Sequence, residues 1–162
     1  MKKYSNYIIL INLIGLLFFF NKSVINKEET IKNGRLVLLK LAPVDPRSLM
    51  QGDYMRLNYD ISRNINLDSI SKRGYCVVKL NDKAVAERIR FQDKLIPKNE
   101  GEYLINYTSA KWRNINIGAE SYFFEEGTSK KYEKAKYGGL KIDDNGNSIL
   151  VGLYDEELRK IE

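Results

Sequence analysis

A continuous apolar run opens the chain and differs from everything that follows it. Between Tyr7 and Phe20 only Asn12 brings a strongly polar side chain into the run. The stretch from Tyr4 to Asn21 holds 18 residues, and a helix of that length extends about 27 Å, close to the ~30 Å hydrocarbon core of a bilayer. The pattern predicts a transmembrane anchor over residues 1–22 that contacts lipid through residues 4–21.

A cleaved signal peptide is the alternative interpretation of the same run. Cleavage requires small residues near the end of the apolar segment, whereas this one ends in Phe18-Phe19-Phe20-Asn21-Lys22. We therefore favour an uncleaved anchor. Lys2 and Lys3 precede the span, while Lys22 and Lys27 follow it, so the bias in charge is slight. The short leading tail favours a cytoplasmic N-terminus, which places the rest of the chain outside the cytoplasm.

Beyond the anchor, the spacing of hydrophobic residues is typical of a helix in some segments and of a strand in others. Residues 23–33 are polar and compatible with a helix, and they form a predicted helical linker; residues 34–162 form one predicted β-rich domain. The expected fold class is an N-terminal transmembrane helix followed by a mainly-β (α+β) domain of antiparallel hairpins with short helices. The expected strands lie at 35–41, 103–108 and 114–117, the hairpins at 74–91 and 140–154, the short helices at 45–50, 129–135 and 156–161, and a break at Gly138-Gly139.

The segment Gly52–Tyr59 shows a strand-like alternation, and it follows a turn that begins at Pro43. Successive side chains of a strand point to opposite faces. The two faces here carry different residues: Met55, Leu57 and Tyr59 on one, and Tyr54, Arg56 and Asn58 on the other. The first face is the predicted core face, and the second is the predicted exposed face.

This segment, Gly-Asp-Tyr-Met-Arg-Leu-Asn-Tyr, matches every fixed position of the motif that names the bacterial GDYXXLXY family. Two later stretches, Gly118–Gly127 and Asp144–Leu153, also resemble blocks of that family. The resemblance implies a small bacterial membrane-anchored protein, with a larger multi-span membrane protein as its expected partner. It implies no catalytic residues.

Composition and charge remove several function classes. The chain has no histidine, so the commonest general base and transition-metal ligand is absent. Cys76 is the single cysteine and lies in a strand-like run, which is typical of a buried small side chain. From Ser23 onward 24 basic residues stand against 21 acidic ones, which is not the charge balance of a nucleic-acid-binding surface. We expect no nucleic acid, no metal and no cofactor.

Several charged side chains remain candidates for binding. Asp53 could hold a cation or an amine, although hydrogen bonds to nearby backbone are the commoner role of Asp at such a junction. Glu87 shares a predicted strand face with Val85, Ile89 and Phe91, and a buried charge there would need a partner. The predicted motif and binding residues are Arg47, Gly52, Asp53, Tyr54, Arg56, Leu57, Tyr59, Glu87, Glu120, Glu126 and Gly127.

A weak similarity to membrane-anchored signal peptidases provides the second function class. Those enzymes combine an N-terminal anchor with a serine shortly before Gly-Asp and a later Lys-Arg strand, and here Ser48 precedes Gly52. Glu87 stands where the general-base lysine would be, and a serine without a base is a poor nucleophile. The predicted function is therefore a non-enzymatic binding or accessory module for a membrane partner, with a serine hydrolase as the alternative.

Overall fold

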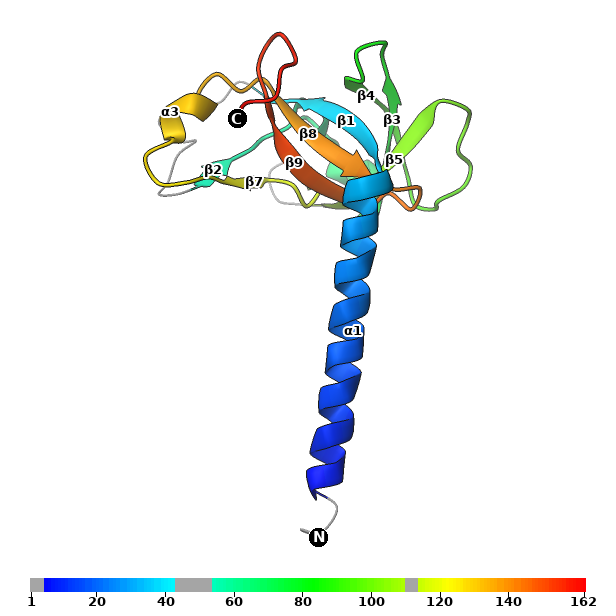
Figure 1. Ribbon diagram of the computed structural model, residues 1–162. Helices are drawn as coiled ribbons and strands as arrows, with labels where there is room; N and C mark the ends of the chain where they lie inside the picture. Colours follow the sequence, from blue (N-terminus) through cyan, green and yellow to red (C-terminus); the bar gives the residue numbers. More distant parts are fainter. Residues whose placement is uncertain (1–4, 43–53, 110–113) are drawn as a thin grey trace.

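The structure is a computed structural model and describes residues 5–42, 54–109 and 114–162. A single long helix projects from one side of a compact β domain, and the N-terminal end lies far from that domain (Figure 1). The C-terminus lies on the domain itself. The predicted fold class, a long apolar helix followed by a mainly-β domain, is confirmed.

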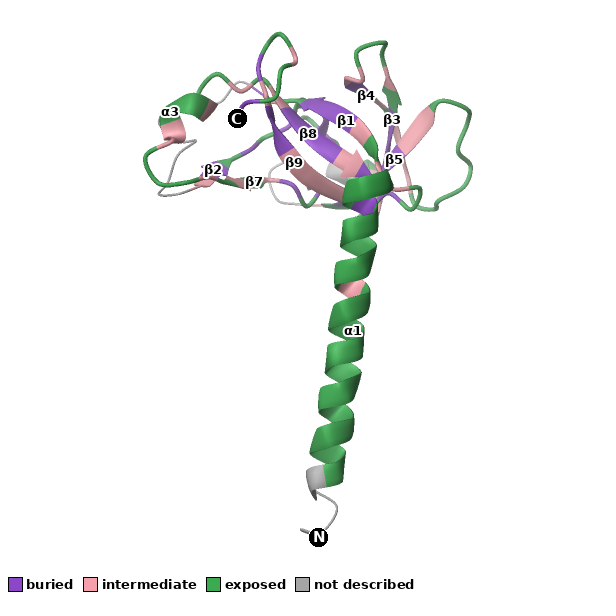
Figure 2. Cartoon of the chain, in the orientation of Figure 1, coloured by how far each residue is buried: buried purple, intermediate pink, exposed green. Residues whose placement is uncertain are grey.

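The helix α1 runs without interruption over Ser5–Asn33. The polar segment predicted as a linker is therefore the upper part of the same helix. Side chains from Tyr7 onward are exposed, with Ser23 and Thr30 as the exceptions (Figure 2). By length and composition the helix could cross a membrane. Gly34 ends it, and its N–H still donates to the Thr30 carbonyl at 2.9 Å.

In the described part of the chain, the β domain consists of three antiparallel sheets. The first has the order β1-β8-β9, the second β2-β7 and the third β4-β3-β5-β6. The strands are β1 (Arg35–Lys40), β2 (Tyr54–Arg56), β3 (Arg73–Leu80), β4 (Ala86–Gln92), β5 (Glu102–Ser109), β6 (Ile115–Asn116), β7 (Ser121–Phe123), β8 (Tyr137–Ile142) and β9 (Ser148–Tyr154). The short helical elements are η2 (Asp60–Ser62), η3 (Leu67–Ser69) and α3 (Ser129–Tyr132).

One hydrophobic core joins the three sheets. Its fully buried members include Val37 and Leu140 from the first sheet, Met55 from the second, and Val78 and Ile105 from the third. Backbone hydrogen bonds connect the sheets as well. The Leu38 N–H donates to the Ala84 carbonyl, and the Asn106 N–H donates to the Gly146 carbonyl. The domain therefore packs as a unit although its sheets are separate.

The two adjacent glycines in the first sheet correct a prediction. Gly138 and Gly139 were expected only to break the preceding, partly helical segment, but both lie inside β8. A Cβ on Gly138 would approach the Tyr59 ring to 2.8 Å, and one on Gly139 would collide with the Tyr154 ring. These glycines leave room for the Tyr59 and Tyr154 rings, which approach the strand closely.

The predicted C-terminal helix is also wrong. The chain reverses after β9, and Lys160 pairs with Tyr154 in an isolated antiparallel bridge. The Asp155 carboxylate accepts the Arg159 backbone N–H at 2.9 Å and the Arg159 Nε–H at 3.1 Å. Leu158 adopts a positive φ of 62°. This turn allows the buried Ile161 to donate its N–H to Leu153.

Candidate functional site

The motif strand has the two faces that its alternation predicts. Met55, Leu57 and Tyr59 are buried, and Arg56 and Asn58 are exposed. Tyr54 is half-buried and lies 5.8 Å from Phe123 between ring centroids. The motif therefore supplies core residues on one side and a narrow exposed strip on the other.

Tyr59 is held by both packing and a hydrogen bond. Its side chain is 1% exposed, and its hydroxyl donates to the Ala119 carbonyl at 2.6 Å. Burial, together with the nearby Glu120 carboxylate, raises the pKa of Tyr59 well above its usual range. The hydroxyl consequently stays protonated and acts as a structural donor.

Glu120 joins the motif to the second block of the family resemblance. Its carbonyl accepts the Leu57 N–H at 2.9 Å, next to the pairing of β2 with β7. Its carboxylate accepts the Ile117 N–H, which closes the turn at Gly118 (φ 81°). Glu120 is thus committed to holding a backbone turn in place.

Glu126 and Gly127 occupy the turn that leads into α3. Gly127 has a φ of 80°, a conformation that glycine adopts without strain. Glu126 is exposed. The Thr128 N–H and hydroxyl both donate to the Glu125 carbonyl, at 3.1 and 2.6 Å. The described contacts give these two residues a turn-forming role.

Glu87 lies on an exposed face of β4, so its charge does not need the partner that burial would require. The pairing of β4 with β3 shifts between Val77 and Val78, so the strand face changes partway along β4. Glu87 is exposed and pairs across from exposed Lys79. Arg88 turns inward instead: it donates to the Ile61 carbonyl at 2.6 Å and lies 5.3 Å from the Phe91 ring.

Other predicted site residues lie outside the described part of the chain. Arg47, Gly52 and Asp53 belong to residues 43–53, as does Ser48 of the hydrolase alternative. Their expected interactions stay predictions. Cys76 does lie within the structure, where burial raises the pKa of its thiol to about 12. That thiol is protonated at neutral pH and is a poor nucleophile.

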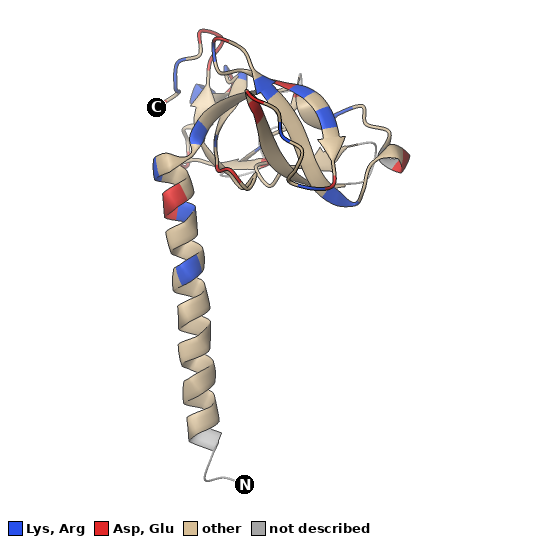
Figure 3. Ribbon diagram, turned by 90° about the vertical axis from the view of Figure 1, so that its right-hand side faces the viewer, with Lys and Arg blue, Asp and Glu red and all other residues tan. Residues whose placement is uncertain are grey.

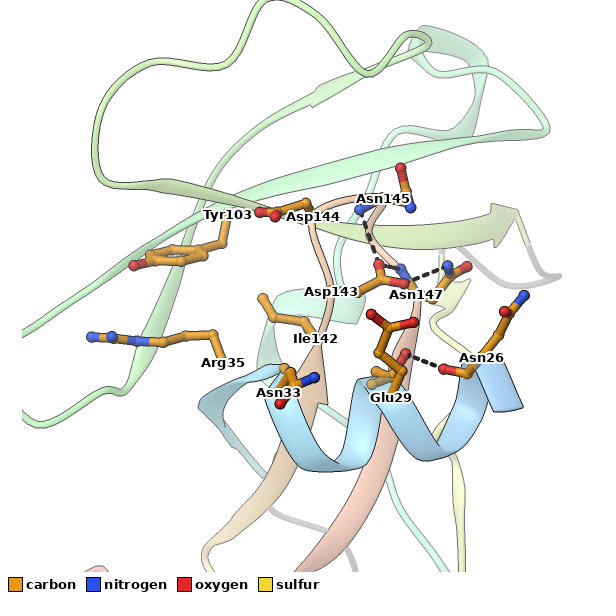
Figure 4. A pocket seen from close by; sticks show the side chains of 12 residues that line it. Asn26, Glu29, Asn33, Arg35, Tyr103, Ile142, Asp143, Asp144, Asn145 and Asn147 are labelled. Atoms are coloured by element: carbon orange, nitrogen blue, oxygen red, sulfur yellow. Dashed lines mark hydrogen bonds between the residues drawn. The ribbon is translucent and has the colours of Figure 1, made fainter. Parts of the chain in front are cut away.

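A recess with a polar lining lies where the helix meets the domain, a place that was not predicted. It has a volume of about 460 Å³ and opens between the end of α1, the start of β5 and the β8–β9 turn. Figure 4 shows Tyr103 and Arg35 at one end, with Asn26, Asn145 and Asn147 at the other.

A second recess of about 390 Å³ continues the first one along the helix. The two share Asn26, Thr30 and Asn147. Ser23 and Lys27 extend the lining by one helical turn toward the N-terminus, because residues three or four apart lie on one helix face. We call these two connected recesses the junction groove.

The turn between β8 and β9 forms one wall of the groove and is rigidly held. The Asp143 carboxylate accepts the backbone N–H groups of Asn145 at 3.0 Å and Asn147 at 2.8 Å, as well as the Asn147 amide at 2.7 Å. The Asn106 amide donates to the Asn147 side chain at 3.1 Å. The sequence marks this segment only as a hairpin turn, because the other walls come from distant segments.

Comparison with known proteins supports the resemblance noted in the motif. No curated protein and no solved structure matches the chain. A family model described as "GDYXXLXY protein" matches residues 16–153, which include the upper half of α1 and nearly the whole β domain. The chain belongs to the GDYXXLXY family.

Proposed function

We propose that the protein is a single-pass membrane protein whose β domain lies outside the cytoplasm and serves a membrane partner as a non-enzymatic binding or accessory module. The observation that carries this proposal is the form of α1. Its apolar half is exposed on all sides, and water does not favour a free-standing helix with such a surface. A bilayer would cover it.

The distribution of charge along the helix supports the same arrangement. The part of α1 nearest the domain carries Lys and Glu side chains, whereas the lower part carries no charge (Figure 3). Residues 21–33 rise about 20 Å at 1.5 Å per residue. We propose that this polar part of the helix, the stalk, holds the β domain above the lipid headgroups.

The proposed orientation rests on the lysines ahead of the apolar span. Lys2 and Lys3 precede it. Basic residues beside a span favour the cytoplasmic side of the membrane. We propose a multi-span membrane protein as the partner, which is the partner that the resemblance to the family implies.

A reporter fused after Glu162 tests the topology. Alkaline phosphatase, which folds only outside the cytoplasm, should be active in this fusion, whereas a cytoplasmic reporter at the same site should not. A matched fusion that lacks residues 5–21 should lose phosphatase activity, because it has no apolar span. Activity of the cytoplasmic reporter on the intact chain would reverse the proposed orientation.

Crosslinking tests the accessory role. In native membranes, a photo-reactive residue in place of Phe123 or Arg56 should capture an integral membrane protein. Both side chains are exposed on the sheet that β2 forms with β7. The same residue at Asp82, in the exposed turn between β3 and β4, is the control. Equal capture at all three positions would argue against a dedicated surface.

A further inference from the structure

We propose that the junction groove binds a neutral, polyhydroxylated ligand, namely a short glycan. The first ground is size. The larger recess has a volume of about 460 Å³ and the adjoining one about 390 Å³, and small-molecule sites typically measure roughly 300–1,000 Å³. Because the recesses follow successive turns of α1, the groove is elongated and suits a chain of sugar rings.

The second ground is the type of side chain that lines the groove. An amide offers both a donor and an acceptor, which matches the two hydrogen-bonding roles of a sugar hydroxyl. Uncharged hydrogen-bonding residues predominate along both recesses: Asn26, Thr30, Asn33, Asn106, Asn145 and Asn147. The amides of Asn106 and Asn147 bond each other, and Thr30 is buried. The amides that the groove offers to a ligand are therefore those of Asn26, Asn33 and Asn145.

The third ground is the aromatic residue at one end of the groove. Tyr103 is half-buried on β5 and lies beside Arg35 in Figure 4. The face of an aromatic ring is electron-rich, so it attracts the weakly positive C–H groups on one side of a pyranose. Such a platform orients a sugar, while the amides distinguish its hydroxyl groups.

The charges in the groove disfavour the other ligand classes. Glu29, Asp143 and Asp144 stand against Lys27 and Arg35, so an anion such as phosphate finds no excess of positive charge. Both oxygens of Asp143 already accept hydrogen bonds from its own turn. Among the residues that the structure describes, no three acidic or cysteine side chains gather as a metal site.

The position of the groove suggests two sources for the glycan. Ser23, three residues beyond Phe20, is its end nearest to the apolar span. A glycolipid headgroup that rises from the bilayer would therefore reach it, and so would a soluble oligosaccharide. The lipid-linked source rests on the membrane topology proposed above, whereas recognition of the sugar itself does not.

Calorimetry on the full-length protein in phosphatidylcholine nanodiscs tests the site, because nanodiscs avoid detergents with sugar headgroups. The probes are chitotetraose, maltotetraose and cellotetraose. We expect binding of at least one of them, with affinity reduced about tenfold by Tyr103→Leu, which removes the aromatic face. Tyr103→Phe should stay within about twofold of wild type, because it retains that face.

Tyr137→Leu is the matched control, since Tyr137 is another half-buried tyrosine, lies on β8 and lines neither recess. It should bind as wild type does. The proposal is overturned if none of the three tetrasaccharides binds, if Tyr103→Leu binds unchanged while circular dichroism shows it to be folded, or if inorganic phosphate occupies the groove and sugars do not.

Hydrogen exchange separates the two sources. In nanodiscs that contain diglucosyl diacylglycerol, protection of residues 142–149 would identify a lipid-linked glycan. Protection by free tetrasaccharide alone would identify a soluble one, and both results support the site. If the reporter fusions reverse the topology while the free sugar still binds, the proposed function fails and the binding site stands.

Discussion

At the scale of single residues, the two tyrosines of the motif have different surroundings. Tyr59 lies against Gly138 in the core and donates to Ala119, whereas Tyr54 is half-buried beside exposed Phe123. Both positions are tyrosine, but the free energy that each ring contributes to folding should differ. The difference follows from strand alternation alone.

We expect Tyr59→Ala to destabilise the protein by about 3–5 kcal/mol, because truncating a buried aromatic leaves a cavity. Tyr54→Ala should cost much less, since its ring keeps partial contact with water in the folded state. Thermal unfolding followed by circular dichroism measures both. Equal loss of stability in the two variants would mean that Tyr54 is also a core residue.

At the scale of elements, an ion pair holds the connection between β4 and β5. Arg90 on β4 binds the Glu102 carboxylate, with one N–O distance of 2.8 Å, and the Asn99 N–H donates to the same carboxylate at 2.9 Å. These contacts, with the Arg90 hydrogen bond first, lower the pKa of Glu102 to about 2. The pair therefore stabilises the fold only while Glu102 is ionised.

The stability that this pair contributes should depend on pH in a defined direction. A carboxylate with a lowered pKa stabilises the folded state above its unfolded pKa of about 4.3, and this contribution is lost as pH falls toward about 2. Glu102→Gln should accordingly lower the Tm near neutral pH, and the difference from wild type should shrink across that window.

Melting curves of both proteins across the acid range test this dependence. Glu87→Gln is the control, because it removes an exposed carboxylate from β4 without removing the contact with Arg90. A gap between wild type and Glu102→Gln that stays constant down to the lowest pH would contradict the assignment.

Sequence patterns predict best the elements that are stabilised by contacts between residues close together in the chain. The two hairpins were predicted, because their alternation and their Asn-, Asp- and Gly-rich turns lie in one continuous stretch. The extra residue in β4 was not predicted. It turns Arg88 toward the core and leaves Glu87 exposed. The glycine pair was misread because the rings that select it, Tyr59 and Tyr154, are identified only by the tertiary packing.

The candidate site was less predictable than the fold for the same physical reason. The core half of the motif, Leu57 and Tyr59, was predicted from its period, and both residues are buried. The junction groove was missed because its walls come from the stalk, β5 and the β8–β9 turn, which are far apart in the chain. Asparagine is also a common turn residue, so its abundance in those segments carries no signal of binding.

At the scale of the whole molecule, the joint between helix and domain is tightly packed. A Cβ on Gly34 would collide with the Thr30 carbonyl oxygen and lie 2.9 Å from the Ile142 carbonyl oxygen. Lys141 donates to the Gly34 carbonyl at 2.9 Å, and Thr30 is buried on the helix side of the joint. These contacts attach the end of the helix to the first sheet.

Gly34→Ala should loosen this joint at a cost of about 1–3 kcal/mol, because backbone atoms must shift to admit the methyl group. We expect a lower Tm and faster hydrogen exchange in residues 142–149. Gly15→Ala is the matched control, because a Cβ there meets nothing within 4 Å. Unchanged exchange in the Gly34 variant would indicate that the joint is more tolerant than its packing suggests.

The unbroken helix gives the stalk a second property besides its length. Each residue added to it turns the domain by about 100° around the helix axis and raises it by 1.5 Å. A two-residue insertion would therefore turn the groove and the exposed side of the motif strand away from a neighbour that binds the membrane span. Every contact within the domain would be kept. Seven added residues complete about two turns, restore the direction and change only the height. The rotation of the domain about the helix axis is thus set by the number of residues between Phe20 and Gly34.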